Sequence, residues 1–221
     1  MNVGVLLAAG ASRRVGSPKA LVSSEGETFL VQGVRNLWAA CDAVVVVLGS
    51  SAARVQRSVE REFERAVASG QLARDLATAE RLGAKGLEVR FVVHAGWRRG
   101  MLSSARAGLV AALELKPGAV LLMPVDQPAV RPATVRGLAG AMDAALSAYR
   151  GKGARARFPY ALIPRNRGRR GHPIALSAAL ARAILADRGG ADLSDTVRRS
   201  ARLVGYLDVA DPGVVQNRNR G

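Results

Sequence analysis

The stretch LLAAGASRRVGSPK, from Leu6 to Lys19, decides how the rest of the chain is interpreted. It continues an apolar run that begins at Val3 and ends at Ala8, and such a short run predicts a buried strand. Gly10 follows, and a glycine lets backbone N–H groups approach a ligand closely because no Cβ stands in the way. Successive free N–H groups in a loop of this kind form an anion-binding concavity.

Two cations in the same stretch, Arg14 and Lys19, add full positive charge suited to phosphate oxygens. The residues therefore predict a polyphosphate-binding loop after the first strand. A tight turn without a ligand is the alternative, because the loop matches neither G-x-x-x-x-G-K-[ST] nor G-x-G-x-x-G. The residues alone leave both interpretations open.

The pattern L-A-A-G-x-S-x-R-x-G-x-P-K resembles the signature of the MobA-like NTP transferases, which handle molybdenum cofactor. Val15 stands where that signature usually has methionine. The resemblance implies a Rossmann-like, three-layer α/β nucleotidyltransferase fold with a mostly parallel sheet. It implies catalytic roles for Arg14 and Lys19. It also implies nucleotide binding by a set of loop residues: Leu7, Ala8, Ala9, Gly10, Ser12, Arg14 and Lys19.

The composition is that of one globular domain covering residues 1–221, with 49% apolar residues. The single cysteine, Cys41, forms no internal disulfide, and no signal sequence precedes the first strand, so we expect a cytoplasmic protein. No apolar run approaches the roughly 18 residues of a membrane span, so we expect no membrane partner.

The formal net charge of +16 is compatible with nucleic-acid binding, because basic residues track phosphate backbones. However, the basic residues are spread along the chain, only four of the 33 are lysines, and aromatic residues are few. This usage is typical of a GC-rich genome, and the chain offers no stacking platform for single strands. We therefore expect anionic nucleotides, rather than nucleic acid, as partners.

Strands alternate with helices along the chain, which predicts an α/β fold with a mostly parallel sheet. Further apolar runs predict strands at 43–49, 87–94, 119–123, 158–164 and 203–209. Periodic stretches predict helices at 28–40, 52–82 with a break near 69–70, 101–115, 132–149, 178–185 and 194–201. Ligands bind beyond the carboxyl ends of parallel strands, which is where the first loop lies.

Asp126 follows the apolar run that ends at Met123 and has a proline on either side, Pro124 and Pro128. An acid at a strand end either caps the next turn or binds a cation such as Mg²⁺, which takes one or two protein carboxylates plus substrate phosphates. The D-x-P segment is similar to the one that holds the catalytic metal in the resembled family. The resemblance therefore implies that Asp126 is a catalytic Mg²⁺ ligand.

Two further segments are similar to the cytidylyltransferase branch of that family. The first contains Trp97, Gly100, Met101 and Ser104, and there the resemblance implies that Gly100 and Ser104 help to hold the nucleotide, although a helix N-terminus alone explains the serine. The second is Gly171-His172-Pro173, where the resemblance implies contact with the pterin substrate or its phosphate. A structural histidine is the alternative for His172, and His94 is expected to be a strand-end residue.

The C-terminus departs from the family pattern. The family usually supplies a second metal ligand there from D-x-D-T-P or N-x-N-T-P, whereas this chain reads Asn217-Arg218-Asn219-Arg220-Gly221. Asn219 is the expected neutral substitute, Asn217 is the other candidate, and an arginine-rich frayed tail is the alternative. Residues 62–85 are longer than the family usually carries, which is compatible with an oligomer contact or a lid.

The resemblance as a whole implies a Mg²⁺-dependent nucleotidyltransferase that moves a nucleoside monophosphate onto a molybdopterin-type cofactor and releases pyrophosphate. CTP is the favoured donor because Ala9 stands where the guanylyltransferases have glycine, and a molybdoenzyme or chaperone is an expected partner. One alternative is a sugar-phosphate or other small-phosphate nucleotidyltransferase on the same fold. Another is a non-catalytic protein that binds nucleotides or nucleic acid.

Overall fold

The computed structural model describes residues 1–10, 18–24, 26–68, 88–150, 158 and 160–218. The strands of its central sheet are β1 (Asn2–Ala8), β4 (Ala43–Leu48), β5 (Glu88–Val93), β6 (Ala119–Pro124), β7 (Tyr160–Asn166), β8 (Arg169–Arg170), β9 (Ile174–Ser177) and β10 (Leu203–Asp208). Their order is β10-β7-β9-β6-β1-β4-β5, with β8 paired to β7. A small separate ribbon pairs β2 (Ser23–Ser24) with β3 (Glu27–Thr28).

The main strands run parallel, apart from β9. β1 pairs in parallel with β4 on one side and with β6 on the other, and β10 pairs in parallel with β7. β9 runs antiparallel to both β6 and β7, so β7 again points the same way as β6. The carboxyl ends of β1, β4, β6, β7 and β10 therefore meet at one edge of the sheet, and the predicted mostly parallel α/β fold is confirmed.

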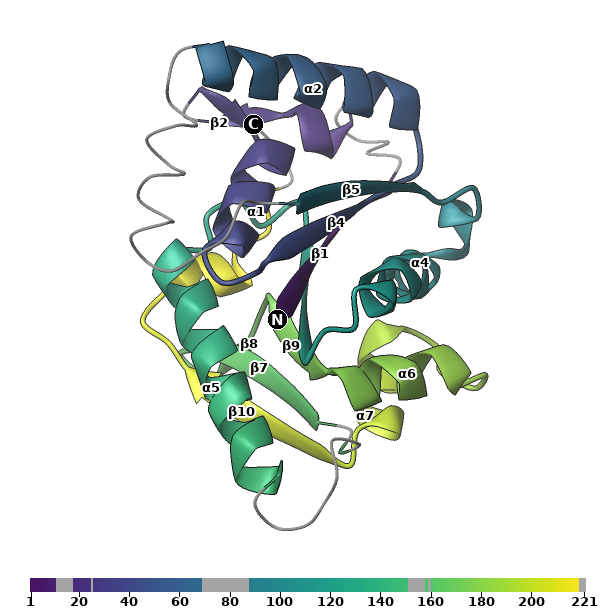
Figure 1. The fold of residues 1–221 in the computed structure, drawn as a ribbon, viewed down its shortest axis with the longest axis vertical. Helices are drawn as coiled ribbons and strands as arrows, with labels where there is room; N and C mark the ends of the chain where they lie inside the picture. Colours follow the sequence, from purple (N-terminus) through teal and green to yellow (C-terminus); the bar gives the residue numbers. More distant parts are fainter. Residues whose placement is uncertain (11–17, 25, 69–87, 151–157, 159, 219–221) are drawn as a thin grey trace.

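Helices cover both faces of the sheet (Figure 1). One layer contains α1 (Phe29–Trp38), α2 (Ala52–Ala68) and α5 (Pro132–Arg150), and the other contains α4 (Met101–Glu114), α6 (Ala178–Ala186) and α7 (Leu193–Ser200). Three short 3-10 helices lie in loops: η1 (Lys19–Leu21), η2 (Trp97–Arg99) and η3 (Pro212–Val215). None of the helices in the described ranges has the length and apolar character that a membrane crossing requires.

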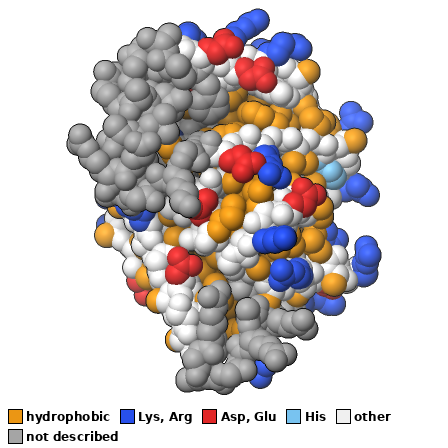
Figure 2. Space-filling view, in the orientation of Figure 1, with side chains coloured by type: hydrophobic (Ala, Val, Ile, Leu, Met, Phe, Trp, Pro, Cys, Tyr) orange, Lys and Arg blue, Asp and Glu red, His pale blue; other side chains and the backbone are white. Residues whose placement is uncertain are grey.

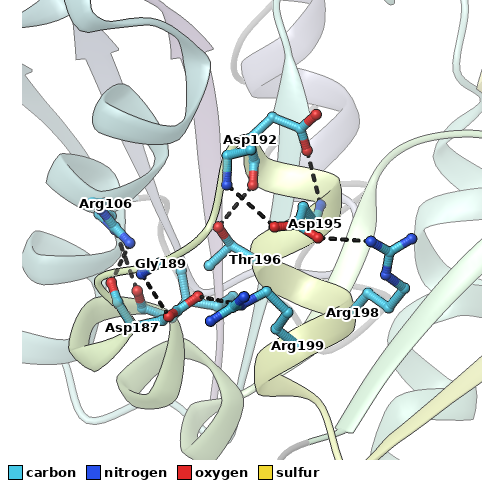
Figure 3. Close-up of polar contacts among 10 residues, drawn as sticks. Arg106, Asp187, Gly189, Asp192, Asp195, Thr196, Arg198 and Arg199 are labelled. Atoms are coloured by element: carbon cyan, nitrogen blue, oxygen red, sulfur yellow. Dashed lines mark hydrogen bonds and ion pairs between the residues drawn. The ribbon is translucent and has the colours of Figure 1, made fainter.

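The strand sequences explain why both faces are covered. In β1, Leu6 and Ala8 pack into the core beneath α1 and α5, whereas Val3, Val5 and Leu7 pack into the core beneath α4 and α6. A strand with apolar side chains on both faces is stable only when each face is buried. Within the second layer, Arg106 links α4 to α6, because its side chain donates hydrogen bonds to two carbonyl groups at the end of α6 (Figure 3).

The structure corrects the sequence-based prediction at two places, and a third prediction lies partly outside the described residues. The strand predicted at 158–164 is β7, which begins at Tyr160 and continues to Asn166. The analysis missed β9, because this strand has only four residues and leads directly into α6. The predicted 52–82 helix is described as α2 up to residue 68, and its predicted break near 69–70 lies outside the described residues.

Candidate active site

The parallel register of β1 and β6 brings two distant loops together. Leu7 pairs with Pro124, and the N–H of Val125 donates to the carbonyl of Leu7 at 3.0 Å. The loop that follows β1 and the loop that follows β6 therefore leave the sheet side by side. This placement delivers Asp126 to the carboxyl edge, where the sequence predicts the phosphate loop.

Lys19 and Asp126 meet at this edge. Lys19 opens η1, and its Nζ lies 3.0 Å from Oδ2 of Asp126, with both side chains partly buried. A partly exposed ion pair of this kind stabilises a fold by no more than about 1 kcal/mol. The pair therefore matters less for the stability of the fold than for placing a positive and a negative charge at this edge of the sheet. The expectation that a cation of the first loop and the mid-chain acid converge is met for Lys19. Arg14 and Ser12 lie outside the described residues.

The described start of the first loop has buried side chains up to Ala9 and an exposed glycine after them. Leu7, Ala8 and Ala9 are each less than a tenth exposed, and so their side chains belong to the core. Gly10 is exposed, and a Cβ built there would meet nothing within 4 Å. No neighbouring group therefore blocks the approach of a ligand to the backbone at Gly10.

The loops after β4 and β5 close the site on the side of β1. The N–H of Ser50 donates to the carbonyl of Ala9 at 3.2 Å. A Cβ at Gly49 would lie 2.5 Å from that carbonyl oxygen and 2.7 Å from Cβ of Trp97, so only glycine allows the three loops to approach. The guanidinium of Arg98 stacks 5.1 Å from the centroid of the Trp97 ring.

Gly100 and Ser104 lie at the start of α4. Gly100 has φ 98°, a left-handed conformation that favours glycine, and α4 begins at the next residue. Ser104 is 5% exposed, whereas Ser103 donates to the carbonyl of Gly100 at 2.8 Å and lies 3.1 Å from Nε2 of His94. His94 follows β5 and holds the turn that leads to α4, as expected for a strand-end residue.

The segment that ends the described chain crosses the Asp126 loop. The N–H of Arg218 donates to the carbonyl of Asp126 at 2.8 Å, and Nε2 of Gln127 donates to Oδ1 of Asn217 at 2.7 Å. The C-terminal residues are therefore at the site, where the family pattern places a second metal ligand. Asn219 itself lies outside the described residues.

A buried carboxylate holds this C-terminal segment in place. Asp211 is 3% exposed and accepts hydrogen bonds from the N–H of Arg131 at 2.9 Å, the hydroxyl of Thr134 at 2.7 Å and the N–H of Gly213 at 2.9 Å. It thus ties η3 to the first turn of α5. Sequence reasoning missed this residue, because an acid before proline carries no sign of its distant partners.

Gly171 and His172 approach the same segment from the other side. The N–H of His172 donates to the carbonyl of Val214 at 2.9 Å, and a Cβ at Gly171 would lie 2.0 Å from that oxygen. Only glycine fits this contact. The peptide bond between His172 and Pro173 is cis. Burial lowers the pKa of His172 to about 4, although the nearby Asp126 carboxylate opposes the shift, so the ring is neutral at physiological pH.

The oxygen atoms at the site suit a hard divalent cation. Among the described residues no cluster of three or more His, Cys, Asp or Glu side chains could hold a metal ion. Gln127 is 4% exposed, and its carbonyl Oε1 is buried with no hydrogen-bond partner among the described residues. The carboxylate of Asp126 is the kind of oxygen ligand that Mg²⁺ takes, together with water and substrate phosphates. The sequence analysis did not identify Gln127, although it directly follows Asp126.

The comparisons place this fold in a known class, the nucleotidyltransferases. The chain matches the MobA-like NTP transferase domain over residues 4–203, and it belongs to that family. A search of curated proteins found no match to the chain.

Solved structures show the same fold. A nucleotidyl transferase from Methanothermobacter has 24% identity and a TM-score of 0.64, and the match covers 100% of this chain and 92% of that one. The manganese complex of Rv0371c from Mycobacterium tuberculosis has 22% identity and a TM-score of 0.58, covering 94% and 88%. A molybdopterin-guanine dinucleotide biosynthesis protein A from Archaeoglobus fulgidus has 21% identity and a TM-score of 0.50, covering 95% and 84%. At these identities the likeness supports the fold and does not identify the substrates.

The buried carboxylate gives a first prediction. The variant Asp211→Ala leaves three hydrogen-bond donors without their acceptor, two of them from the start of α5, and so the free energy of unfolding falls by about 3 kcal/mol. Urea denaturation followed by circular dichroism measures this loss. The control Asp192→Ala removes an exposed cap of α7 (Figure 3), and about 1 kcal/mol is expected. Equal losses in the two variants would contradict the anchoring role.

The histidine gives a second prediction. The folded protein takes up a proton on His172 only near pH 4, whereas the unfolded chain does so near its ordinary pKa of 6.5. The stability that this difference supplies is therefore complete above pH 6.5 and is lost as the pH falls toward 4, by up to about 3 kcal/mol. Urea unfolding at pH 7, 6, 5 and 4 measures it. His172→Asn flattens this part of the curve, and parallel curves for wild type and His172→Asn would show the assignment to be wrong.

Proposed function

We propose that the protein transfers CMP from CTP to the phosphate of a molybdopterin-type cofactor, releases pyrophosphate and depends on Mg²⁺. The observation that carries the proposal is the contact between Lys19 and Asp126, 3.0 Å apart at the carboxyl edge of the sheet. A cation of the phosphate loop and a carboxylate from mid-chain share one position there. Membership of the MobA-like family supports the reaction class.

The reaction requires little covalent chemistry from the protein. An oxygen of the acceptor phosphate forms a bond to the α-phosphorus of the nucleotide, while the bond from that phosphorus to the bridging oxygen of pyrophosphate breaks. Both reactants are anionic, so the protein must hold them in line and offset the charge that grows on the leaving group. A bound Mg²⁺ supplies further positive charge to the phosphate oxygens.

The residues of the site divide this task. The backbone at Gly10 receives the triphosphate, and the ammonium of Lys19 neutralises charge on the phosphate groups. Asp126 would hold the divalent ion through its carboxylate, and Asn219 is the candidate for a further ligand. His172 is neutral at physiological pH, so in this proposal its ring contacts the acceptor as a hydrogen-bonding group without adding charge.

The metal ligand is tested by Asp126→Asn, which keeps the shape of the side chain and removes its charge. Pyrophosphate release in the presence of Mg²⁺ falls at least about 100-fold, because the divalent ion loses its carboxylate. The control Asp192→Asn makes the same charge change at the cap of α7, where asparagine caps equally well, and keeps full activity. An Asp126→Asn enzyme within threefold of the wild-type rate would overturn the proposed role.

The donor base is tested in a single-turnover assay with molybdopterin as acceptor and each of the four NTPs in turn. CTP is expected to react at least about 10-fold faster than the others, a preference of roughly 1.4 kcal/mol. GTP is the main rival, and GTP alone, or equal use of all four, would overturn the CTP assignment.

A screen of sugar phosphates as acceptors distinguishes the proposed reaction from that of a sugar-phosphate or other small-phosphate nucleotidyltransferase. If the protein binds RNA with a steep salt dependence and releases no pyrophosphate, the alternative of a non-catalytic nucleic-acid-binding protein would be favoured.

A further inference from the structure

A cleft of about 740 Å³ lies beyond the carboxyl ends of β7 and β10. These strands point the same way as β6, so the cleft opens at the edge of the sheet that carries Asp126. Its lining comes from three places: the β7–β8 hairpin, the end of β10 with Asp208, and η3 with its exit. The residues used below are Arg165, Asn166, Arg167, Arg169, Val215 and Gln216. None of the site residues expected from the sequence lies in it.

The cleft carries positive charge that its own walls do not neutralise. Arg165 forms two hydrogen bonds with the carboxylate of Asp208, from Nε at 3.0 Å and from Nη2 at 2.8 Å. Arg167 and Arg169 form no ion pair within the described part of the chain, and both are exposed. An arginine pair in a concave site is suited to bind an oxyanion through several N–H donors.

Arg167 occupies an unusual backbone position. Arg165 pairs with Arg170 and Asn166 with Arg169, so Arg167 and Gly168 form a two-residue hairpin turn. Their φ values are 49° and 77°, both left-handed, and such a turn favours asparagine followed by glycine. An arginine is retained there at an energetic cost, and strained positions of this kind cluster at functional sites.

The cleft is held rigidly and is close to the active site. The side-chain amide of Asn166 donates to the carbonyl of Val209 at 2.8 Å, which joins the ends of β7 and β10. Gln216 lines the cleft, and two residues later the N–H of Arg218 donates to the carbonyl of Asp126. The short segment 216–218 therefore links the two places. Apolar groups of Pro212 and Val215 form part of the wall beside the arginines.

We propose that this arginine cleft binds a second anionic group of the acceptor, separate from the phosphate that receives the nucleotide. The inference rests on the proposed function and narrows it. The acceptor carries two anionic groups joined by a body with an apolar face, which lies along η3. A phosphorylated molecule with a single anionic group fills only the part of the site near Lys19.

The first experiment tests the cleft without any reaction. Inorganic phosphate is titrated into the ¹⁵N-labelled protein, and the Nε–H signals of arginine are followed by NMR. We expect saturable shifts for Arg167 and Arg169, and only weak, linear shifts for Arg136 and Arg182, which are exposed outside the cleft. Shifts at Arg167 and Arg169 no larger than those at the two reference arginines would overturn the cleft as an anion site.

The second experiment tests its role in the reaction. The double variant Arg167→Gln/Arg169→Gln raises KM for molybdopterin at least about 10-fold and leaves kcat and KM for CTP unchanged. The control Arg136→Gln/Arg182→Gln makes the same charge change and leaves all three constants unchanged. An unchanged acceptor KM in the cleft variant would overturn the inference while the proposed function stands. If the wild type releases no pyrophosphate with any acceptor, the proposed function fails, and the phosphate titration alone decides whether the cleft binds an anion.

Discussion

The parallel pairing of β1 with β6 is the constraint on which the rest of the structure depends. The register of Leu7 against Pro124 fixes where two loops leave the sheet, and a shift of this pairing would move Asp126 away from η1. Residues 19 and 126 are far apart along the chain, yet their side chains meet at 3.0 Å. The contact is weak as a contribution to stability, and so the sheet determines the position of the two charges, not the reverse.

Another part of the site is formed by the C-terminal segment, which returns along the carboxyl edge of the sheet. β10 ends at the edge, Asp211 anchors η3 to α5, and residues 216–218 then lie across the Asp126 loop. The tight contact of Gly171 with the carbonyl of Val214 fixes the other side of this segment. The C-terminal segment thus separates two parts of one edge, the Lys19–Asp126 pair and the arginine cleft. On the proposed function, the nucleotide and the acceptor phosphate meet at the Lys19–Asp126 pair, and the cleft takes the second anionic group of the acceptor.

The net charge of the chain does not tell where the positive side chains lie in the folded protein or which of them have acidic partners. The net charge of +16 suggests a general basic surface, and Figure 2 shows Lys and Arg side chains dispersed over the visible face rather than gathered in one patch. Several arginines are neutralised locally, as Arg165 is by Asp208 and Arg198 by Asp195. Arg167 and Arg169 line a concave site and form no ion pair within the described residues, and composition cannot reveal that property.

The sequence alone determined the class of the fold, because continuous apolar runs such as 43–48 require burial on both faces and alternate with helical periodicity. It also singled out Lys19, which closes the motif after the first strand, and Asp126, which follows the end of β6. Only the tertiary structure decided that β9 is inserted antiparallel, that Asp211 anchors the tail, that Gln127 has a buried oxygen without a partner in the described part of the chain, and that the hairpin arginines line a cleft. Each of these depends on contacts between residues distant in the chain, and local propensity carries no information about such partners.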